Sequence, residues 1–529
     1  MPSKRAADSA PAGQAKRTAG RTAASVYRHY VSDNPFGIKP LGNMLFDSQP
    51  PARPHGLGAF APLDDHLLLE LLADSDAFGG PDGDRALCRL ARASRAWYCL
   101  AYNDAVWRQR TIARFGGDFV FAGSWRNTFK RCVIVSRQRS AGRSISDDDG
   151  QDPPGLVRDA IIRVPGMFSD VIYTSWRCSS VPLEHLCGTA VDNIDRRSGL
   201  SMADFVREYT EPNRPVILTD VVTSWPAFGK WSMDYFVRNY GRKLFRAEAV
   251  DMAFEDYARY AAQAHEESPL YLFDKHFAED SSLAADYTVP EFFAEDLFQV
   301  LGNRRPDYRW LIVGPARSGS TFHVDPNSTS AWNAVITGAK KWVMFPPEHI
   351  PPGVFPSADG SEVTSPVSLA EWFMNYYSEL DQSPATRKHI ECVCRAGEIL
   401  YVPNGWWHCV MNLSESIAVT QNFVTSENLV NVLDFAEFRP EQVSGFCHGD
   451  LYTEFVDALR SQRPEVLEAT QKRRAAKLRA ANLDAAKARC TVSSSESFWS
   501  KLSAAPSADG DTVEADEAAS GGSFLFSFE

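Results

Sequence analysis

The chain has 529 residues, of which 44% are hydrophobic and 23% are charged. This length allows roughly two to four domains, at least one of them with a sizeable core. No apolar run approaches the roughly 18 residues that cross a bilayer, and residues 1–30 lack the apolar region of a secretory signal, so neither a membrane-spanning nor a secreted protein is expected.

Charge is unevenly distributed along the chain. Residues 1–30 hold six basic side chains and one acidic side chain. Residues 463–490 hold eight basic and three acidic side chains, whereas residues 491–529 hold one basic and seven acidic side chains. The middle of the chain therefore carries a net charge of −16, against −12 for the whole chain. A negative field disfavours nucleic-acid binding there and concentrates cationic partners, such as basic protein segments.

The ten cysteines show neither a CxxC pair nor a zinc-binding spacing. Without a secretory signal, they are expected to be reduced thiols of a cytosolic or nuclear protein. Cys392 and Cys394 are two positions apart on a predicted strand, so their side chains share one face. They form either half of a metal site or a pair of packed thiols, and the packed pair is favoured because thiols are commonly buried.

Residues 1–56 are predicted to be a disordered basic arm, because they are rich in Ala, Arg, Ser and Pro and show little periodicity. Lys4-Arg5 and Lys16-Arg17 have the spacing of a bipartite nuclear-import signal. This predicts a nuclear protein, with the cytoplasm as a second location. The alternatives are a basic tail that carries no targeting signal and, less favoured, a mitochondrial presequence.

Residues 57–131 are predicted to form a small helical domain. PLDDHLLLELL places Leu63, Leu67 and Leu71 on one apolar stripe. After a Gly/Pro/Asp break, a second helical stretch places apolar residues at similar spacing, namely Leu87, Leu90, Trp97 and Trp107, with Ser94 among them.

This segment resembles an F-box, whose pattern of PxxL, LxxLxxxSxxW and a following Trp-Arg is present, although the insertion ADSDAFGGPDGD lengthens the first connection. The resemblance implies a docking surface for the Skp-type adaptor of cullin ubiquitin ligases. As the alternative, the short helices simply pack on the next domain.

Residues 132–195 are expected to be a linker and the lead-in to a catalytic domain at residues 196–440. That domain has many short strands between Pro and Gly turns, which predicts a mainly β double-stranded β-helix, or jelly roll, with flanking helices. One such helix is expected within SLAEWFMNYYSEL. Its Glu371 and Glu379, and Asp381 beyond it, either meet a cationic substrate or form a solvated face, and the solvated face is favoured.

The catalytic domain contains a pattern typical of a metal site. His323 and Asp325 are two positions apart in a strand-like context, so they point to the same side. His408 follows a Pro-Asn-Gly turn and two tryptophans, where it can close the site from another strand. Two histidines and one carboxylate on one face of an ion are typical of non-haem Fe(II) oxygenases, although such sites also accept Mn, Co, Ni or Zn.

A lysine is positioned to hold an anion near that ion. Lys340 begins the predicted strand KKWVMFPP, and a lysine turned into the domain interior needs an anionic partner. The hydroxyl and amide groups of Ser320, Asn333 and Thr420 lie at strand-like positions where they can complete the anion site.

The pattern HVDPxxTSAWNAxxxGxKxW, followed by PxGWWHxVxNL and TQNF, resembles the JmjC family of 2-oxoglutarate oxygenases over residues 196–440. Within that family it is most similar to the lysyl hydroxylase and arginine demethylase branch, once described as a phosphatidylserine receptor. The resemblance implies Fe(II) ligands at His323, Asp325 and His408. It also implies 2-oxoglutarate contacts at Lys340, Ser320, Asn333, Thr420, Asn422 and Tyr271, with Ser320 standing where the pattern has a threonine.

The resemblance implies an enzyme that uses Fe(II), 2-oxoglutarate and O2 to hydroxylate protein side chains. Hydroxylation of a lysyl carbon leaves a stable alcohol, whereas a hydroxylated N-methyl group on arginine or lysine is lost as formaldehyde. The expected substrate is a basic protein of the histone, splicing or ribosomal type. The alternative is an F-box substrate adaptor whose JmjC domain is not catalytic.

Residues 441–490 are predicted to form C-terminal helices. Leu451, Phe455 and Leu459 mark an apolar stripe on the first. The last, KRRAAKLRAANLDAAKAR, is basic and suits acidic partners, RNA or nuclear import, although such a run is more often a solvated face. Residues 491–529 are expected to be a disordered acidic and Ser-rich tail.

Overall fold

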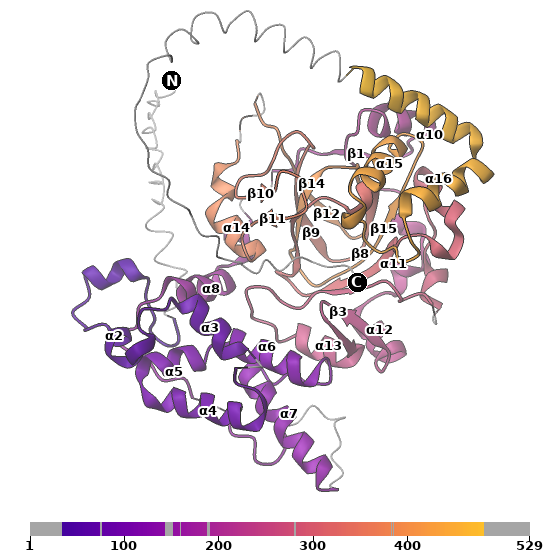
Figure 1. Ribbon diagram of the computed structural model, residues 1–529. Coiled ribbons are helices and arrows are strands. Elements are labelled where there is room, and N and C mark those ends of the chain that lie inside the picture. The colour runs from indigo at the N-terminus through magenta and orange to yellow at the C-terminus, as the bar shows by residue number, and fades with distance from the viewer. Residues whose placement is uncertain are drawn as a thin grey trace, which may run out of the picture.

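The computed structural model describes residues 34–74, 77–142, 152–158, 160–187, 191–279, 282–381, 383 and 386–480. The basic arm before residue 34 and the tail predicted for residues 491–529 lie outside these ranges. Within them, no helix is both long enough and apolar enough to span a bilayer. Figure 1 shows a helical unit, coloured indigo to purple, beside a β-rich unit coloured magenta to orange.

The helical unit contains one short and five longer helices, each joined to the next by a short connection or loop. They are α2 (Ala52–Gly56), α3 (Asp65–Ala73), α4 (Gly80–Ala93), α5 (Arg95–Ala101), α6 (Asp104–Phe115) and α7 (Trp125–Ser140). Side-chain caps explain where several begin, because the Asp64 carboxylate accepts from Leu67 N and the Ser94 hydroxyl accepts from Trp97 N. α7 continues to Ser140, across the boundary predicted at residue 131.

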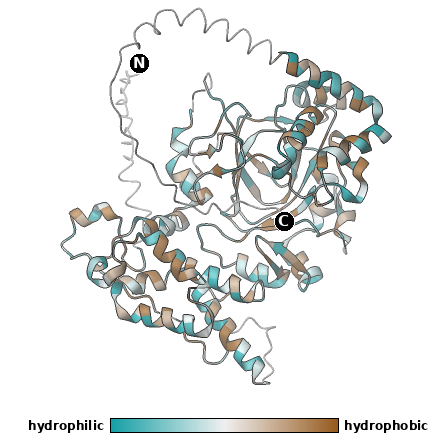
Figure 2. Ribbon diagram, in the orientation of Figure 1, coloured by the Kyte–Doolittle hydropathy of each residue, from teal (hydrophilic) through white to brown (hydrophobic). Residues whose placement is uncertain are grey.

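The apolar stripe predicted on α3 is wrong. Leu63 and Leu67 are 38% and 50% exposed, whereas Leu68 and Leu72 are fully buried. Figure 2 shows α3 as largely hydrophobic, because DHLLLELLA carries leucines on most of its circumference. Periodicity alone therefore did not identify its buried face. On the second helical stretch, Leu87, Trp97 and Trp107 are buried as expected.

The helical unit and the β-rich unit share one hydrophobic core. A single cluster of buried side chains extends from Leu68 and Trp107 in the helices to Trp332 and Val419 in the large sheet. Phe121 packs edge-on against Tyr260 of α13 (Phe254–Ala261), with ring centroids 5.2 Å apart. The prediction of a disordered arm over residues 1–56 is wrong for residues 34–56, which join this body, because Ile38 is buried in the same cluster.

The β-rich unit contains two facing sheets. The larger has nine strands in the order β1 (Asp195–Arg197), β2 (Val216–Leu218), β13 (Ile399–Val402), β8 (Ser330–Thr337), β15 (Ser416–Phe423), β6 (Arg309–Gly314), β5 (Leu272–Asp274), β3 (Leu244–Ala247) and β4 (Val250–Ala253). The smaller has four, in the order β12 (Ile390–Arg395), β9 (Ala339–Phe345), β14 (Trp407–Asn412) and β7 (Gly319–His323).

All strand pairs in these two sheets are antiparallel except β1 with β2. Alternate side chains of the sheets meet between them, where Val335 and Leu400 of the large sheet join Trp342 and Met344 of the small one. The predicted jelly roll with flanking helices is confirmed.

Short helices surround the sheets. They include α8 (Asp170–Ser180), α9 (Leu183–Leu186), α10 (Met202–Phe205), α11 (Pro226–Lys230), α12 (Met233–Tyr240), α14 (Leu369–Asn375), α15 (Leu429–Phe438) and α16 (Leu451–Gln462). The minor strands β10 (Phe355–Pro356) and β11 (Val363–Thr364) form a separate hairpin. Leu451, Phe455 and Leu459 are buried on α16 as predicted, and residues 464–480 form a further helix.

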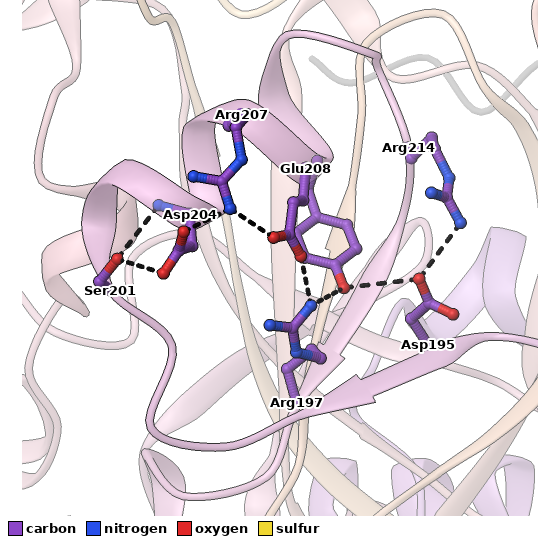
Figure 3. Close-up of polar contacts among 8 residues, drawn as sticks. Asp195, Arg197, Ser201, Asp204, Arg207, Glu208 and Arg214 are labelled. Atoms are coloured by element: carbon purple, nitrogen blue, oxygen red, sulfur yellow. Dashed lines mark hydrogen bonds and ion pairs between the residues drawn. The ribbon is translucent and has the colours of Figure 1, made fainter.

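A network of charged side chains lies along the β1 edge of the large sheet (Figure 3). Arg197 on β1 donates to Glu208 and, at 2.9 Å, to the Tyr209 hydroxyl in the helical turn that follows α10. Arg214 pairs with Asp195 at 3.1 Å. An edge strand presents unpaired backbone groups, and charged side chains keep such an edge from pairing with another chain.

Candidate metal centre

Three potential metal ligands gather at one end of the two sheets. His323 ends β7, Asp325 follows it, and His408 lies on β14, which pairs with β7 so that His408 is opposite His323. One ligand atom from each of the three lies within 4.8 Å of the others, and no other such group occurs in the described ranges. The imidazole centroids are 4.2 Å apart. The structure thus brings together all three predicted ligands.

Backbone carbonyls orient both imidazoles. His323 Nδ1 lies 2.8 Å from the Thr321 carbonyl oxygen, and His408 Nδ1 lies 3.0 Å from that of Trp406. Because a carbonyl only accepts, Nδ1 must carry the proton in each ring. Nε2 then keeps its lone pair for a metal ion, which is the usual way a second contact fixes a histidine ligand.

Burial keeps both histidines neutral, which is the protonation state in which an imidazole can bind a metal ion. It lowers the pKa of His408 to about 4, and burial together with the nearby His408 lowers the pKa of His323 to about 4. Burial also raises the pKa of Asp325 to about 6, although His323 and the Asn422 amide act in the opposite direction. Asp325 Oδ2 is buried without a hydrogen-bond partner, so this carboxylate is suited to a cation.

Lys340 lies deeper between the sheets, as predicted. It is fully buried, and its Nζ donates to the Tyr271 hydroxyl at 2.8 Å and to Asn412 Oδ1 at 3.0 Å. Burial lowers the pKa of Lys340 to about 7, and no ion pair to it occurs among the described residues. A buried ammonium with only neutral neighbours needs an anion, such as a carboxylate, to balance its charge.

The adjacent lysine shows the contrast. Lys341 points to the other face of β9, where its Nζ lies 2.6 Å from Glu391 Oε2. Because successive side chains of a strand alternate, one lysine is neutralised on the outer face and the next is kept for the interior.

A β-bulge brings Ser320 to the interior. Val410 is opposite Ser320 and His408 is opposite His323, so the two residues of β7 between them, Thr321 and Phe322, face the single residue Cys409 of β14. Without the bulge, Ser320 and His323 would lie on opposite faces, since their separation is odd. The bulge therefore allows both predicted site residues to face the same cavity.

The remaining predicted contacts lie on neighbouring strands. Asn333 of β8 is paired with Thr420 of β15, and its Oδ1 is buried without a partner. The Thr420 hydroxyl donates to the Trp332 carbonyl at 2.8 Å, which leaves its oxygen able to accept. The Asn422 amide donates to Thr329 Oγ1 at 2.8 Å beside Asp325.

Two polar residues of this site were not predicted. Asn412 accepts from Lys340, and its Nδ2 donates to Ser318 Oγ at 2.9 Å. Since Asn412 is four positions after His408 on the same strand face, strand periodicity was the signal that could have found it. Ser318 had no comparable signal, because it lies in a turn.

Other predicted candidates lie outside the site. Cys392 and Cys394 are buried with Trp342 and Met344 and belong to no metal-binding group, so the packed-pair interpretation is confirmed. The Glu371 carboxylate accepts from Val367 N at 3.0 Å at the start of α14, and Asp381 accepts from Ser383 N at 2.9 Å. These two carboxylates serve local structure.

The residues fit Fe(II) and 2-oxoglutarate. Two neutral imidazoles and a carboxylate on one side of an ion form the facial arrangement of non-haem Fe(II) oxygenases. Asp325 Oδ2, Asn333 Oδ1 and the Lys340 ammonium are buried groups that the protein itself leaves without a full set of partners. A metal ion and a chelating dicarboxylate would satisfy all three.

Fold and site together define a cupin oxygenase, and comparisons with known proteins agree. Residues 202–428 match the family model described as a cupin-like domain. The arginine-specific demethylase JMJ22 of Arabidopsis thaliana is 44% identical over 83% of this chain and 83% of its own length.

Two further relatives are similar over shorter parts. The lysine-specific demethylase JMJ21 of A. thaliana is 36% identical over 71% of this chain and 38% of its own length. The bifunctional arginine demethylase and lysyl-hydroxylase psr-1 of Caenorhabditis elegans is 37% identical over 52% of this chain and 70% of its own length. The chain belongs to the JmjC family of Fe(II)- and 2-oxoglutarate-dependent oxygenases.

Proposed function

We propose that the chain demethylates N-methylated arginine side chains of basic proteins. The observation that carries this proposal is the similarity to the arginine-specific demethylase JMJ22, which extends over 83% of both chains and therefore reaches beyond the oxygenase domain. The net charge of −16 in the middle of the chain supports a cationic substrate.

The chain's own residues would act by holding and orienting. His323, Asp325 and His408 would hold the metal, and Lys340 would pair with the far carboxylate of 2-oxoglutarate. When bound, the metal and this cosubstrate supply the oxidation of a C–H bond by one oxygen atom of O2. If that bond belongs to an N-methyl group, the hydroxymethyl product releases formaldehyde and leaves the arginine N–H.

Lysyl hydroxylation is the second candidate, because the relative psr-1 is named for both activities. The two reactions differ only in which C–H bond of the substrate lies next to the metal. We expect the methyl group to be preferred, since the relative with the broader coverage is named for arginine demethylation alone.

Mass spectrometry of peptide products tests the proposal. Peptides containing methylated arginine or unmodified lysine are incubated with protein, Fe(II), ascorbate and 2-oxoglutarate. Loss of one methylene mass, with formaldehyde and succinate formed in equal amounts, is the expected result. Gain of one oxygen on lysine without demethylation would refute arginine specificity. His323→Ala, which removes a metal ligand, provides the inactive control, and activity that the unaltered chain shows and this variant lacks would also argue against a purely adaptor role.

We also propose that the helical unit docks a Skp-type adaptor. It has an apolar groove of about 400 Å³ between α3 and α4, lined by Phe60, Leu71, Leu90 and Trp97 among others. With the F-box pattern, this groove suits an apolar helix of a partner. Leu90→Asp should abolish binding of a purified adaptor, whereas Leu244→Asp, at an exposed leucine of β3, should not. Equal binding by both variants would refute the docking site.

We propose nuclear import through Lys4-Arg5 and Lys16-Arg17 rather than through the C-terminal basic helix. On that helix, Arg474 pairs with Asp434 at 2.6 Å and Lys477 pairs with the same carboxylate at 3.2 Å. These intramolecular ion pairs also make RNA binding by those two side chains less favourable. Alanine at the four N-terminal basic residues should leave a fluorescent fusion in the cytoplasm, and unchanged nuclear fluorescence would refute the signal.

A further inference from the structure

A buried side-chain amide connects the two loops that carry the metal ligands. Asn404 lies in the turn before His408, and its Nδ2 donates to the Ser328 hydroxyl at 3.1 Å, three positions after Asp325. Its Oδ1 accepts from Asn431 of α15 at 3.2 Å, and its backbone carbonyl accepts from Asn213 at 3.0 Å. Asn404 is only 7% exposed.

The same turn sets the orientation of His408. The Trp406 indole donates to the Asn213 carbonyl at 2.8 Å, so the segment at Asn213 holds the turn at both Asn404 and Trp406. The Trp406 carbonyl in turn accepts from His408 Nδ1 at 3.0 Å. A displacement of Asn404 would therefore be passed to the imidazole through Trp406, whose carbonyl orients the ring.

A second buried amide holds the loop after Asp325. Asn327 Nδ2 donates to the Ser444 carbonyl at 2.8 Å, and Asn327 Oδ1 accepts from Ser444 N at 3.0 Å. Asn327 and Ser328 both have left-handed backbone conformations, with φ of 54° and 57°. Two successive non-glycine residues rarely adopt such values, so the loop conformation requires the contacts that surround it.

We propose that Asn404 and Asn327 are positioning residues that set the geometry of the three metal ligands: the Asn404 amide fixes the Asp325 loop against the His408 turn, and the Asn327 amide fixes the same loop against the segment at Ser444. The connection continues to the C-terminal helices, because Asn431 Oδ1 accepts from Lys477 Nζ at 3.0 Å. Helices α15 and 464–480 thus anchor the metal site from outside. This role of the two asparagines depends on the metal site formed by His323, Asp325 and His408, and it does not depend on methylated arginine being the substrate.

The test compares metal binding by Asn404→Ala and Asn327→Gly with that of the unaltered chain. Glycine adopts φ near 54° without strain, so Asn327→Gly removes only the amide clamp. Co(II), added to the full-length protein, reports both affinity and ligand geometry through its visible absorption. We expect the dissociation constant to rise about tenfold in each variant and the absorption bands to shift.

Asn239→Ala is the matched control, because this asparagine is exposed on α12 and donates only to the Tyr235 carbonyl. It should bind Co(II) with unaltered affinity and spectrum. If Asn404→Ala does not fold, Asn431→Ala removes the outer anchor alone and should shift the spectrum in the same direction. Unaltered Co(II) affinity and spectrum in Asn327→Gly and in either other variant would overturn the proposal.

Discussion

At the scale of single residues, the two adjacent lysines of β9 have opposite roles. Lys341 is neutralised by Glu391, whereas Lys340 has only hydroxyl and amide neighbours and a pKa of about 7. A bound dicarboxylate favours the charged lysine and raises its pKa. Binding of 2-oxoglutarate should therefore take up a proton wherever the pH exceeds the pKa of the unliganded lysine.

We predict that the affinity for 2-oxoglutarate falls about tenfold per pH unit above pH 7, because the free lysine loses its proton while the complex retains it. Calorimetric titrations in buffers of different ionisation enthalpy, with Lys340→Met as the control, measure both the affinity and the proton uptake. Lys340→Met should bind weakly and without proton uptake. A pH-independent affinity in the unaltered chain would contradict the assignment.

The metal ligands give a second prediction. His323→Ala should reduce succinate formation to background, because two ligands cannot hold the ion against water. Its melting temperature in the absence of metal should stay close to that of the unaltered chain, because His323 is only partly buried. Succinate assays and thermal melts measure the two effects. Succinate formation above background would show that another group holds the metal.

At the scale of elements, the small sheet is held by a buried cluster on its outer face. Glu391 of β12 accepts from Lys341 at 2.6 Å, from Tyr377 at 2.7 Å and from His389 at 3.0 Å. Although burial acts in the opposite direction, hydrogen bonds from His389 and Lys341 hold the pKa of Glu391 at about 2. The folded pKa is below the unfolded value, so the stabilisation is complete above about pH 4.5 and is lost as the pH falls toward 2.

We predict that Glu391→Ala lowers the free energy of unfolding by about 3–5 kcal/mol at neutral pH, because it leaves the Lys341 ammonium buried without a counter-ion. The double variant Lys341→Met, Glu391→Leu should lose less, since it removes both charges. Urea denaturation measures the difference. Equal losses in the single and double variants would mean that packing, and not the charge pair, explains the effect.

The sequence predicted the metal ligands better than the helix faces, for a physical reason. His323, Asp325 and His408 can be identified from their side-chain chemistry and from strand periodicity, and both signals depend only on residues close together in the chain. The buried face of α3 depends on what packs against it, and its many leucines permit several faces. The bulge before His323 and the amides of Asn404 and Asn327 depend on contacts between segments far apart in the chain, for which the sequence has no local signal.

At the scale of the whole molecule, the helical unit is part of the enzyme's body rather than a tethered module. Arg108 of α6 donates to Glu248 at 2.8 Å and to the Ser268 carbonyl at 2.9 Å, both in the β-rich unit. Trp125 and Phe121 pack against Tyr260 beside it. A shared core and partly buried ion pairs of this kind couple the unfolding of the two units.

We therefore predict a single cooperative thermal transition for residues 34–480, observed by calorimetry. Arg108→Ala should lower its midpoint by several degrees, because Glu248 and Glu266 lose a partly buried cation. Arg85→Ala, which removes an exposed pair within α4, should change the midpoint little. Two separate transitions, or an oxygenase domain that remains stable after removal of residues 34–142, would show that the helical unit is independent.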